Sequence, residues 1–112
     1  MRLEMRGVNF ELDDLLKDHI ERRLRFALGR FAARIRQLTV RLTDDNGLRG
    51  GVDTRCRIAV DLVPRGEVMV EVTGDEPFAL TADAAKRTGR AVRRELERRR
   101  EGRYPRVELQ YA

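Results

Sequence analysis

Apolar and polar residues alternate along four stretches of the chain, and this two-residue period predicts β-strands with one buried face. The stretches are residues 2–8, 37–43, 54–62 and 67–73. In the third stretch, Cys56, Ile58 and Val60 fall on one side, whereas Arg55 and Arg57 fall on the other. Because all four stretches alternate, the sheet that they form should have one apolar face and one wet face.

Between the first two strands, apolar residues recur every three or four positions, which is the period of an amphipathic helix. We expect this helix from Asp14 to Phe31, with the carboxylate of Asp13 capping its free backbone N–H groups. Gly29 leaves the last turn open. The inward stripe consists of Leu12, Leu16, Ile20, Leu24, Ala27 and Phe31.

A second helix is expected over residues 78–103, after a cap at Asp75 or Glu76 and with Pro77 tolerated in its first turn. Its inward stripe is narrow and made mostly of small residues, so the helix should sit close to whatever it packs against. The stripe consists of Phe78, Ala82, Ala85, Gly89, Val92 and Leu96. We interpret Asp75 and Phe78 as structural residues, a cap and a core anchor.

The order β-α-β-β-β-α predicts one α+β domain. Three consecutive strands form an antiparallel meander, and the intervening helix lets the first two strands pair in parallel through a right-handed crossover. Both helices must cover the single apolar face, which gives a two-layer sandwich with a four-stranded sheet. We expect the domain over residues 1–101. Residues 102–112 should form a short tail, whose VELQY segment either adds an edge strand or is poorly ordered.

Positive charge is concentrated in the second helix. From Lys86 to Arg106 there are ten Lys or Arg and three Asp or Glu, a net charge of +7. The whole chain carries +5, so the remainder, with 14 basic and 16 acidic residues, carries −2. Localised positive charge suits a polyanion, because neutralising phosphates releases counterions. Nearly all the cations are arginine, which favours bidentate phosphate contacts, although a GC-rich genome would produce the same bias.

Arg87, Arg90, Arg94 and Arg98 form a ridge on the outer side of the second helix. We expect this ridge to be uncompensated by acids and therefore to bind phosphates; the alternative is a solvated helix face. The full set of expected RNA-contacting residues spans both helices and consists of Arg22, Arg23, Arg25, Lys86, Arg87, Arg90, Arg93, Arg94 and Arg98.

The inventory of reactive side chains is small, with no Ser, no Trp, one His and one Cys. A serine nucleophile is excluded, and a His/Cys metal site would lack ligands. We therefore predict no enzymatic activity, no catalytic residue, no metal, no cofactor and no small-molecule substrate. His19 is interpreted as a packing residue and Cys56 as a small buried hydrophobe. A single Cys, no membrane-spanning apolar run and no signal core predict a cytoplasmic protein without membrane association.

Two segments carry a resemblance to a known family. The first is RLEMRGVNFELDDLLKDHIERRLRFALGRFAARIRQLTVRL, an apolar strand, a turn, a capped helix that ends in basic residues, and a strand. The second is VEVTGDEPFALTADAAKRTGRAVRR, which follows the family's strand, Gly-x-Asp-x-Tyr-x-Ala motif and basic helix. Over roughly residues 1–100 the chain thus resembles the ribosome hibernation-promoting factor and ribosome-associated inhibitor family, also called the sigma-54 modulation family.

Within this resemblance, Phe78 stands at the aromatic position of the motif. The residues that stand where the family has basic helix residues are Arg22, Arg23, Arg87, Arg90 and Arg94. The chain departs from the pattern at Thr81, where an apolar residue is expected, at Asp83, which is displaced, and at Thr88 and Gly89, which replace bulkier residues. These departures should weaken the second helix, since Gly in a helix interior costs about 1 kcal/mol relative to Ala.

The resemblance implies binding to the small ribosomal subunit at the decoding region, in the space used by mRNA and the A- and P-site tRNAs. Translation would then be blocked sterically in stationary phase or under stress. The chain looks like a short form without the second domain that pairs ribosomes in some members. Two alternatives stay open: a general RNA-binding module of the double-stranded type, and a protein-interaction modulator of transcription that uses its sheet edge or tail. Weak self-association of the free protein is also left open.

Overall fold

The computed structural model describes residues 1–45 and 53–111, with side chains described up to residue 100. Its elements are β1 (Arg2–Val8), α1 (Asp14–Leu28), the 3₁₀ helix η1 (Gly29–Arg34), β2 (Ile35–Asp44), β3 (Thr54–Leu62), β4 (Glu67–Gly74) and α2 (Pro77–Tyr111). The predicted order β-α-β-β-β-α is confirmed.

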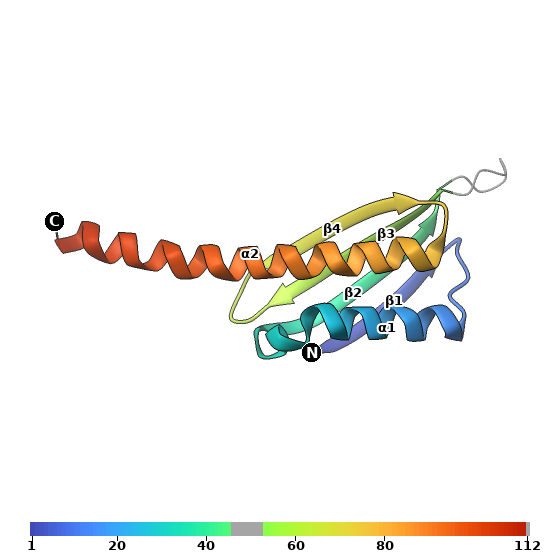
Figure 1. Ribbon diagram of the computed structural model, residues 1–112, viewed down its shortest axis with the longest axis horizontal. Coiled ribbons are helices and arrows are strands. Elements are labelled where there is room, and N and C mark those ends of the chain that lie inside the picture. The colour runs from blue at the N-terminus through green and yellow to red at the C-terminus, as the bar shows by residue number, and fades with distance from the viewer. Residues whose placement is uncertain (46–52, 112) are drawn as a thin grey trace.

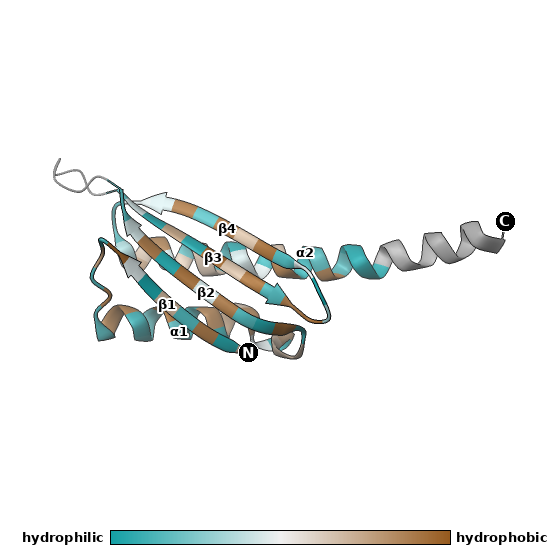
Figure 2. Ribbon diagram, turned by 180° about the vertical axis from the view of Figure 1, so that it is seen from behind, coloured by the Kyte–Doolittle hydropathy of each residue, from teal (hydrophilic) through white to brown (hydrophobic). Residues whose placement is uncertain are grey.

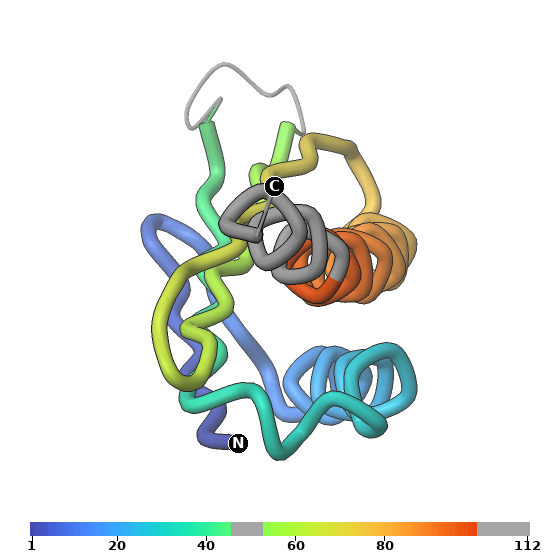
Figure 3. Tube along the Cα trace, turned by 90° about the vertical axis from the view of Figure 1, so that its left-hand side faces the viewer, coloured from blue at the N-terminus to red at the C-terminus, as the bar shows by residue number. Residues whose placement is uncertain are grey.

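The four strands form one sheet in the order β1-β2-β3-β4. β1 and β2 pair in parallel, and the other two pairs are antiparallel, as the crossover and the meander predict. Both helices lie side by side on one face of this sheet (Figure 1 and, seen along the helices, Figure 3). The opposite face is open, and Figure 2 shows hydrophilic and hydrophobic residues alternating along its strands. The structure is therefore the expected two-layer α+β sandwich.

The core lies between the sheet and the helices. From the sheet it takes the inward residues of the alternating pattern, such as Leu38, Val40 and Ile58, each at most 1% exposed. From α1 it takes residues that recur every four positions, namely Leu16, Ile20, Leu24 and Leu28. Removal of these side chains from water is the main favourable contribution to the stability of the layered arrangement.

The start of each helix is capped as the sequence indicates. The backbone N–H of Leu16 donates to Oδ1 of Asp13 at 2.9 Å. At α2 the side chain of Glu76, rather than that of Asp75, accepts from the backbone N–H groups of Phe78 and Ala79, at 2.8 and 3.2 Å. Both caps satisfy donors that have no partner within the helix.

The end of the first helix was predicted too late. The α-helix stops at Leu28 instead of Phe31, and residues 29–34 continue as the 3₁₀ helix η1. The tighter turn changes the direction of the side chains after Gly29, because a 3₁₀ helix has three residues per turn instead of 3.6.

The buried stripe of α2 also differs from the prediction. Ala85 and Val92 are buried as expected, whereas Phe78 is 40% exposed and does not anchor the core. Its ring lies 5.0 Å from that of His19, and its carbonyl oxygen is 2.9 Å from Nε2 of the same histidine. The buried residues of α2 include four that the predicted stripe does not contain, namely Leu80, Thr81, Ala84 and Thr88.

Two threonines take core positions in α2 because their hydroxyl groups find partners inside the helix. Thr81 Oγ1 donates to the carbonyl oxygen of Pro77 at 2.8 Å, and Thr88 Oγ1 donates to that of Ala84 at 2.7 Å. Burial of a hydroxyl is costly only when it lacks a hydrogen bond. These departures from the family pattern are thus accommodated without an unsatisfied polar group in the core among the described side chains.

The bounds of α2 include residues 107–111, so the VELQY segment forms no edge strand. The side chains of residues 101–112 lie outside the description, and the division into a domain of residues 1–101 and a tail stays a prediction.

Candidate nucleic-acid interface

A groove of about 700 Å³ runs between α1 and α2 on the surface that faces away from the sheet. Its floor consists of small residues, Ala27, Ala82, Ala85 and Gly89. A Cβ atom added at Gly89 would lie 3.0 Å from the carbonyl oxygen of Ala27 and 3.2 Å from its Cβ, so the two helices are in close contact there. The predicted packing of α2 through small residues is therefore correct, and the neighbour that it meets at Gly89 is α1.

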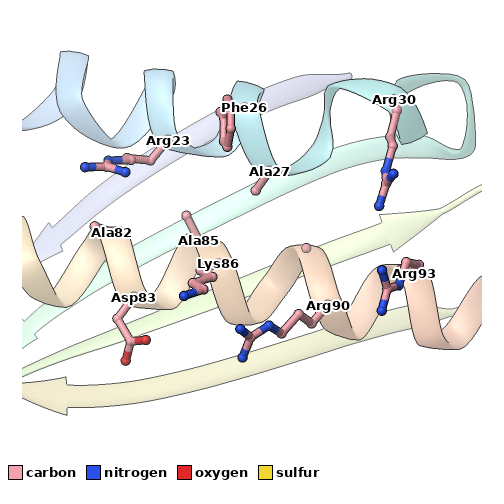
Figure 4. Close-up of a pocket in the computed structure, with 11 residues that line it drawn as sticks. Arg23, Phe26, Ala27, Arg30, Ala82, Asp83, Ala85, Lys86, Arg90 and Arg93 are labelled. Atoms are coloured by element: carbon pink, nitrogen blue, oxygen red, sulfur yellow. The ribbon is translucent and has the colours of Figure 1, made fainter.

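The rim of the groove is cationic. Five basic residues line it, and they come from both sides: Arg23, Arg30, Lys86, Arg90 and Arg93. Figure 4 shows Arg23 and Arg30 on the side of α1 and η1 that faces α2, with Lys86, Arg90 and Arg93 along α2. The acidic residue among the groove-lining side chains is Asp83.

Most of the groove cations lack an acidic partner. In the described part of the chain, Arg23, Lys86 and Arg90 have neither an ion pair nor a side-chain hydrogen bond, and all three are exposed. Arg93 lies 3.7 Å from Glu97, but both side chains are more than half exposed, so water screens this pair. The guanidinium of Arg30 lies 4.9 Å from the centre of the Phe31 ring, a contact that leaves its charge uncompensated. The groove therefore retains most of its positive charge.

The remaining predicted contact residues lie outside this groove. Arg22 and Arg94 are exposed and unpaired among the described residues. Arg25 lies on the opposite flank of α1, next to Met1 and Leu3, and its Nη2 atom is 2.8 Å from Oε1 of Glu21. The two helices thus bring together four of the nine predicted residues, Arg23, Lys86, Arg90 and Arg93.

The expectation that the α2 ridge is uncompensated by acids is wrong for two of its four arginines. Arg87 Nε lies 3.0 Å from Oδ2 of Asp83, and Arg98 is paired with Glu95. The acid precedes the arginine by four residues in the first pair and by three in the second, which places both partners on one helix face. This spacing is visible in the sequence, so the pairing could have been predicted. Arg90 and Arg94 have no ion pair among the described residues.

Glu95 is the centre of a small ion-pair cluster that joins α2 to the sheet. Its carboxylate accepts from Arg99 Nε at 3.0 Å, and this bond, together with the charge of Arg98, lowers the pKa of Glu95. Arg99 is only 28% exposed and lies against Gly66, in the turn between β3 and β4. Gly66 has a φ of 101°, and its missing Cβ leaves the space that the guanidinium occupies. Arg99 is therefore partly engaged in holding the fold, and Arg98 is paired within its own helix.

Two groove residues were missed at the sequence level, Arg30 and Phe26. Arg30 lies in the last turn of the predicted helix, which Gly29 left open, and it was not among the predicted contact residues. Phe26 is 91% exposed and does not belong to the inward stripe. In the sequence it comes after Arg22, Arg23 and Arg25 and directly before Ala27. A large apolar residue on the polar face of an amphipathic helix is an unusual pattern that could have been noticed.

The fold and the groove place this chain among small two-layer α+β domains with a basic helical face. The chain belongs to the Sigma 54 modulation protein / S30EA ribosomal protein family, whose sequence model matches residues 3–100. This is a family of ribosome hibernation and subunit interface proteins, and its members are ribosome-associated factors without enzymatic activity. The resemblance seen in the sequence is confirmed.

Solved structures resemble the fold closely. The N-terminal domain of Thermus thermophilus Protein Y is 28% identical with a TM-score of 0.69, over 84% of this chain and 98% of that one. A ribosomal subunit interface protein from Coxiella burnetii is 13% identical with a TM-score of 0.68, over 86% and 99% of the two chains, and this likeness shows the fold alone. A comparison with curated protein sequences found no match.

The described residues contain neither a helix suited to a membrane nor a cluster of metal ligands. No helix among them combines the length and the apolar character that crossing a membrane requires. No three or more His, Cys, Asp or Glu side chains among them are grouped so that they could hold a metal ion.

Proposed function

We propose that this protein binds the small ribosomal subunit through the groove between α1 and α2 and blocks translation by occupying the decoding region. The observation that carries the proposal is the set of cations that two helices present to one groove with hardly any acidic partner. Membership of a ribosome-associated family supports it, as does the fold shared with a protein described as a ribosomal subunit interface protein.

The chemistry of the groove favours ribosomal RNA over an acidic protein as the partner. Guanidinium groups bind phosphate oxygens in a bidentate manner, and phosphate contacts position a protein without reading base sequence. Structured RNA is recognised largely through its shape and backbone, which suits a rigid domain in a fixed channel. The helices are held on the sheet by a continuous core, so the cations are presented at fixed spacing.

The nine predicted residues should contribute unequally. The strongest contacts are expected from the unpaired groove residues Arg23, Lys86 and Arg90. Arg22 and Arg94 are free to bind phosphates at the margins of the same face. Arg87 and Arg98 must exchange a carboxylate for a phosphate, which reduces their net contribution. Arg25, on the far flank of α1, should contribute least.

Sedimentation of the purified protein with isolated small and large ribosomal subunits tests the proposal. We expect the protein to co-sediment with small subunits and to be released as salt increases from about 50 to about 200 mM. Roughly five phosphate contacts predict a slope of about −4 in a plot of log affinity against log salt concentration. Equal binding to both subunits, or a protein that stays at the top of the gradient, would contradict the proposal.

Competition distinguishes the decoding region from other sites on the small subunit. Pre-bound mRNA and initiator tRNA should exclude the protein, and the protein should reduce tRNA binding in return, because the coupling between two ligands is reciprocal. Chemical probing of the ribosomal RNA should show protection at the decoding region. Simultaneous binding of tRNA, mRNA and the protein would locate it elsewhere and would rule out steric blocking. A preference for free double-stranded RNA over subunits would instead favour a general RNA-binding module.

A further inference from the structure

The groove contains one feature that phosphate binding does not explain, an aromatic ring in water. Phe26 is 91% exposed, which makes it the most exposed large apolar side chain in the described part of the protein. It lines the groove with the cations, and no ring contact involving it occurs among the described residues. An isolated exposed apolar residue needs no explanation, but an aromatic ring that borders a cationic groove combines two binding chemistries.

The ring lies between two of the groove arginines. Arg23 precedes Phe26 by three residues and Arg30 follows it by four, and all three line the groove. Arg90 lines the same groove from α2. A ligand that fills this space meets an aromatic face with positive charge on both sides. An unpaired nucleotide carries the matching groups, a planar base and a phosphate on either side of it.

We propose that Phe26 is a stacking platform for one unpaired RNA base, with the adjoining phosphates held by Arg23, Arg30 and Arg90. The proposal rests on the proposed function and deepens it, because it assigns a base-binding position within a face otherwise expected to contact only the RNA backbone. Paired bases are unavailable for stacking on a side chain, so the nucleotide belongs to a single-stranded loop, a bulge or an end. The groove volume of about 700 Å³ lies within the roughly 300–1,000 Å³ typical of sites for small-molecule-sized ligands.

The chain offers a direct probe, because it contains no Trp. In Phe26→Trp the indole is the sole tryptophan and keeps the ability to stack. Three polyanions are compared: a short oligoadenylate, inorganic polyphosphate and poly-glutamate. We expect oligoadenylate to quench the tryptophan emission at saturation, and the two polyanions without bases to bind with little quenching. Equal quenching by polyphosphate or poly-glutamate, or binding of oligoadenylate without quenching, would overturn the stacking proposal.

Binding to small subunits tests the same position in the intended complex. Phe26→Ala should weaken binding by about tenfold, since stacking of one base on an aromatic side chain typically changes affinity by roughly 5- to 100-fold. Phe26→Leu should weaken binding as much as Phe26→Ala does, because leucine keeps apolar area but has no ring on which a base can stack. Phe26→Tyr keeps the ring and should bind as the wild type does. Leu15→Ala is the matched control: Leu15 is 74% exposed on the same helix and does not line the groove.

The salt dependence separates this proposal from the proposed function. Loss of a base contact should leave the slope against salt unchanged, whereas Arg23→Gln together with Arg90→Gln should make it shallower by about 2. If Phe26→Ala binds like the wild type while the arginine variant is weakened, the stacking proposal fails and the phosphate-binding face stands. If wild-type protein does not bind small subunits at all, both fail. Unchanged thermal unfolding of the Phe26 variants confirms that a change in affinity does not reflect misfolding.

Discussion

The two outer faces of this molecule both carry arginines, but acids of the sheet pair with several arginines on its open side, whereas most cations of the groove between the helices have no acidic partner among the described residues. On the open side of the sheet, arginines form ion pairs with acids on another strand or a strand end. The pairs are Arg57–Glu71 at 3.2 Å, Arg36–Asp61 at 3.2 Å and Arg55–Asp45 at 3.1 Å. On the helical side, Arg23, Lys86 and Arg90 have no such partner in the described part of the chain.

The difference arises from geometry rather than from the number of arginines. In the sheet, the register places Glu71 directly opposite Arg57, so that arginine has a cross-strand acid within reach, whereas Arg41 on the other side of Arg57 has no ion pair among the described residues. Between the helices, the residues that face each other across the groove are basic on both sides. Like charges at the rim oppose one another slightly, and a polyanion removes that repulsion. A basic face binds an external anion only when its own fold has not already supplied one.

Charge reversal in the groove should produce the largest effect on binding, and charge reversal on the sheet should produce almost none. Arg23→Glu with Arg90→Glu should weaken binding to small subunits by at least about 100-fold, since a hydrogen bond to a charged group contributes roughly 1.5–3 kcal/mol. Sedimentation or filter binding at a fixed salt concentration measures the change. The matched control is Arg6→Glu with Arg41→Glu, which alters net charge equally. Arg6 and Arg41 are cross-strand neighbours, exposed and unpaired among the described residues of the sheet.

The control variant is expected to bind within about threefold of the wild type, because screening over a Debye length of about 10 Å isolates the two faces from each other. If both double variants lose affinity to the same extent, binding follows net charge, and the comparison between the faces is wrong.

A substitution in the groove floor tests geometry with all charges kept. Gly89→Val should lower the free energy of unfolding by about 1–3 kcal/mol, because the added atoms collide with the backbone of Ala27 and force the helices apart. It should also weaken subunit binding, since the cations on the two rims move relative to each other. Urea unfolding and sedimentation measure the two effects.

Gly29→Val serves as the control for that substitution. A Cβ at Gly29 would meet nothing within 4 Å, so its effect on stability should stay within about 0.5 kcal/mol. Equal effects of the two substitutions would mean that the close approach of the helices at Gly89 does not determine the positions of the groove cations.

The fold could be predicted almost completely from the sequence, because each strand alternates and each helix has a recognisable start. The exact inward stripe of α2 could not. Ala residues occur on several sides of that helix, so the hydrophobic pattern distinguishes the buried side only weakly. Phe78 was predicted to be buried because it is large and apolar. The predicted inward stripe does not contain Thr81 and Thr88, because a side chain with a hydroxyl counts as polar in a hydrophobic pattern. In the folded helix their hydroxyls bond to carbonyls of the preceding turn, and the rest of each side chain is buried.

The site could be predicted as a set of exposed cations but not as a groove. Which cations share the groove depends on how α1 and α2 are placed, and that placement follows from the contact between Gly89 and Ala27. These residues are far apart in the chain, and nothing in their local sequence indicates that they meet. Arg30 belongs to the site although it lies in η1, beyond the end of α1. The prediction that Arg87 and Arg98 lack acidic partners was wrong for a different reason. Their partners, Asp83 and Glu95, precede them by four and three residues, so the sequence itself indicates both ion pairs.

The core between the two faces should respond to alkaline pH through Cys56. Burial raises the pKa of this thiol to about 12 from 9.0. Because the folded-state pKa is raised, the contribution to stability is complete below pH 9 and is lost as pH rises toward the folded-state value. By about pH 10 the loss should be about 1 kcal/mol. Urea unfolding near pH 8 and about pH 10 measures it, with Cys56→Val as the variant that removes the thiol.

Between these two pH values, the free energy of unfolding of the valine variant should fall by about 1 kcal/mol less than that of the wild type. The loss should affect the sheet face and the helical face together, because they share this core. An identical loss in both proteins would mean that the thiol ionises in the folded state as readily as in the unfolded chain.

The smallest effect is expected on the sheet face itself. A double-mutant cycle with Arg57→Ala and Glu71→Ala should give a coupling of about 0.2–1 kcal/mol, because the two side chains are 47% and 41% exposed and water screens them. Glu71→Gln leaves Arg57 without its acid, which creates on the sheet the condition found in the groove. Subunit binding should nevertheless stay unchanged, since Arg57 and its cross-strand neighbour Arg41 lie on the sheet, away from the groove between the two helices that is expected to hold the RNA. A gain in affinity upon Glu71→Gln would show that neutralisation alone, and not the placement of two helices, keeps the sheet face from binding RNA.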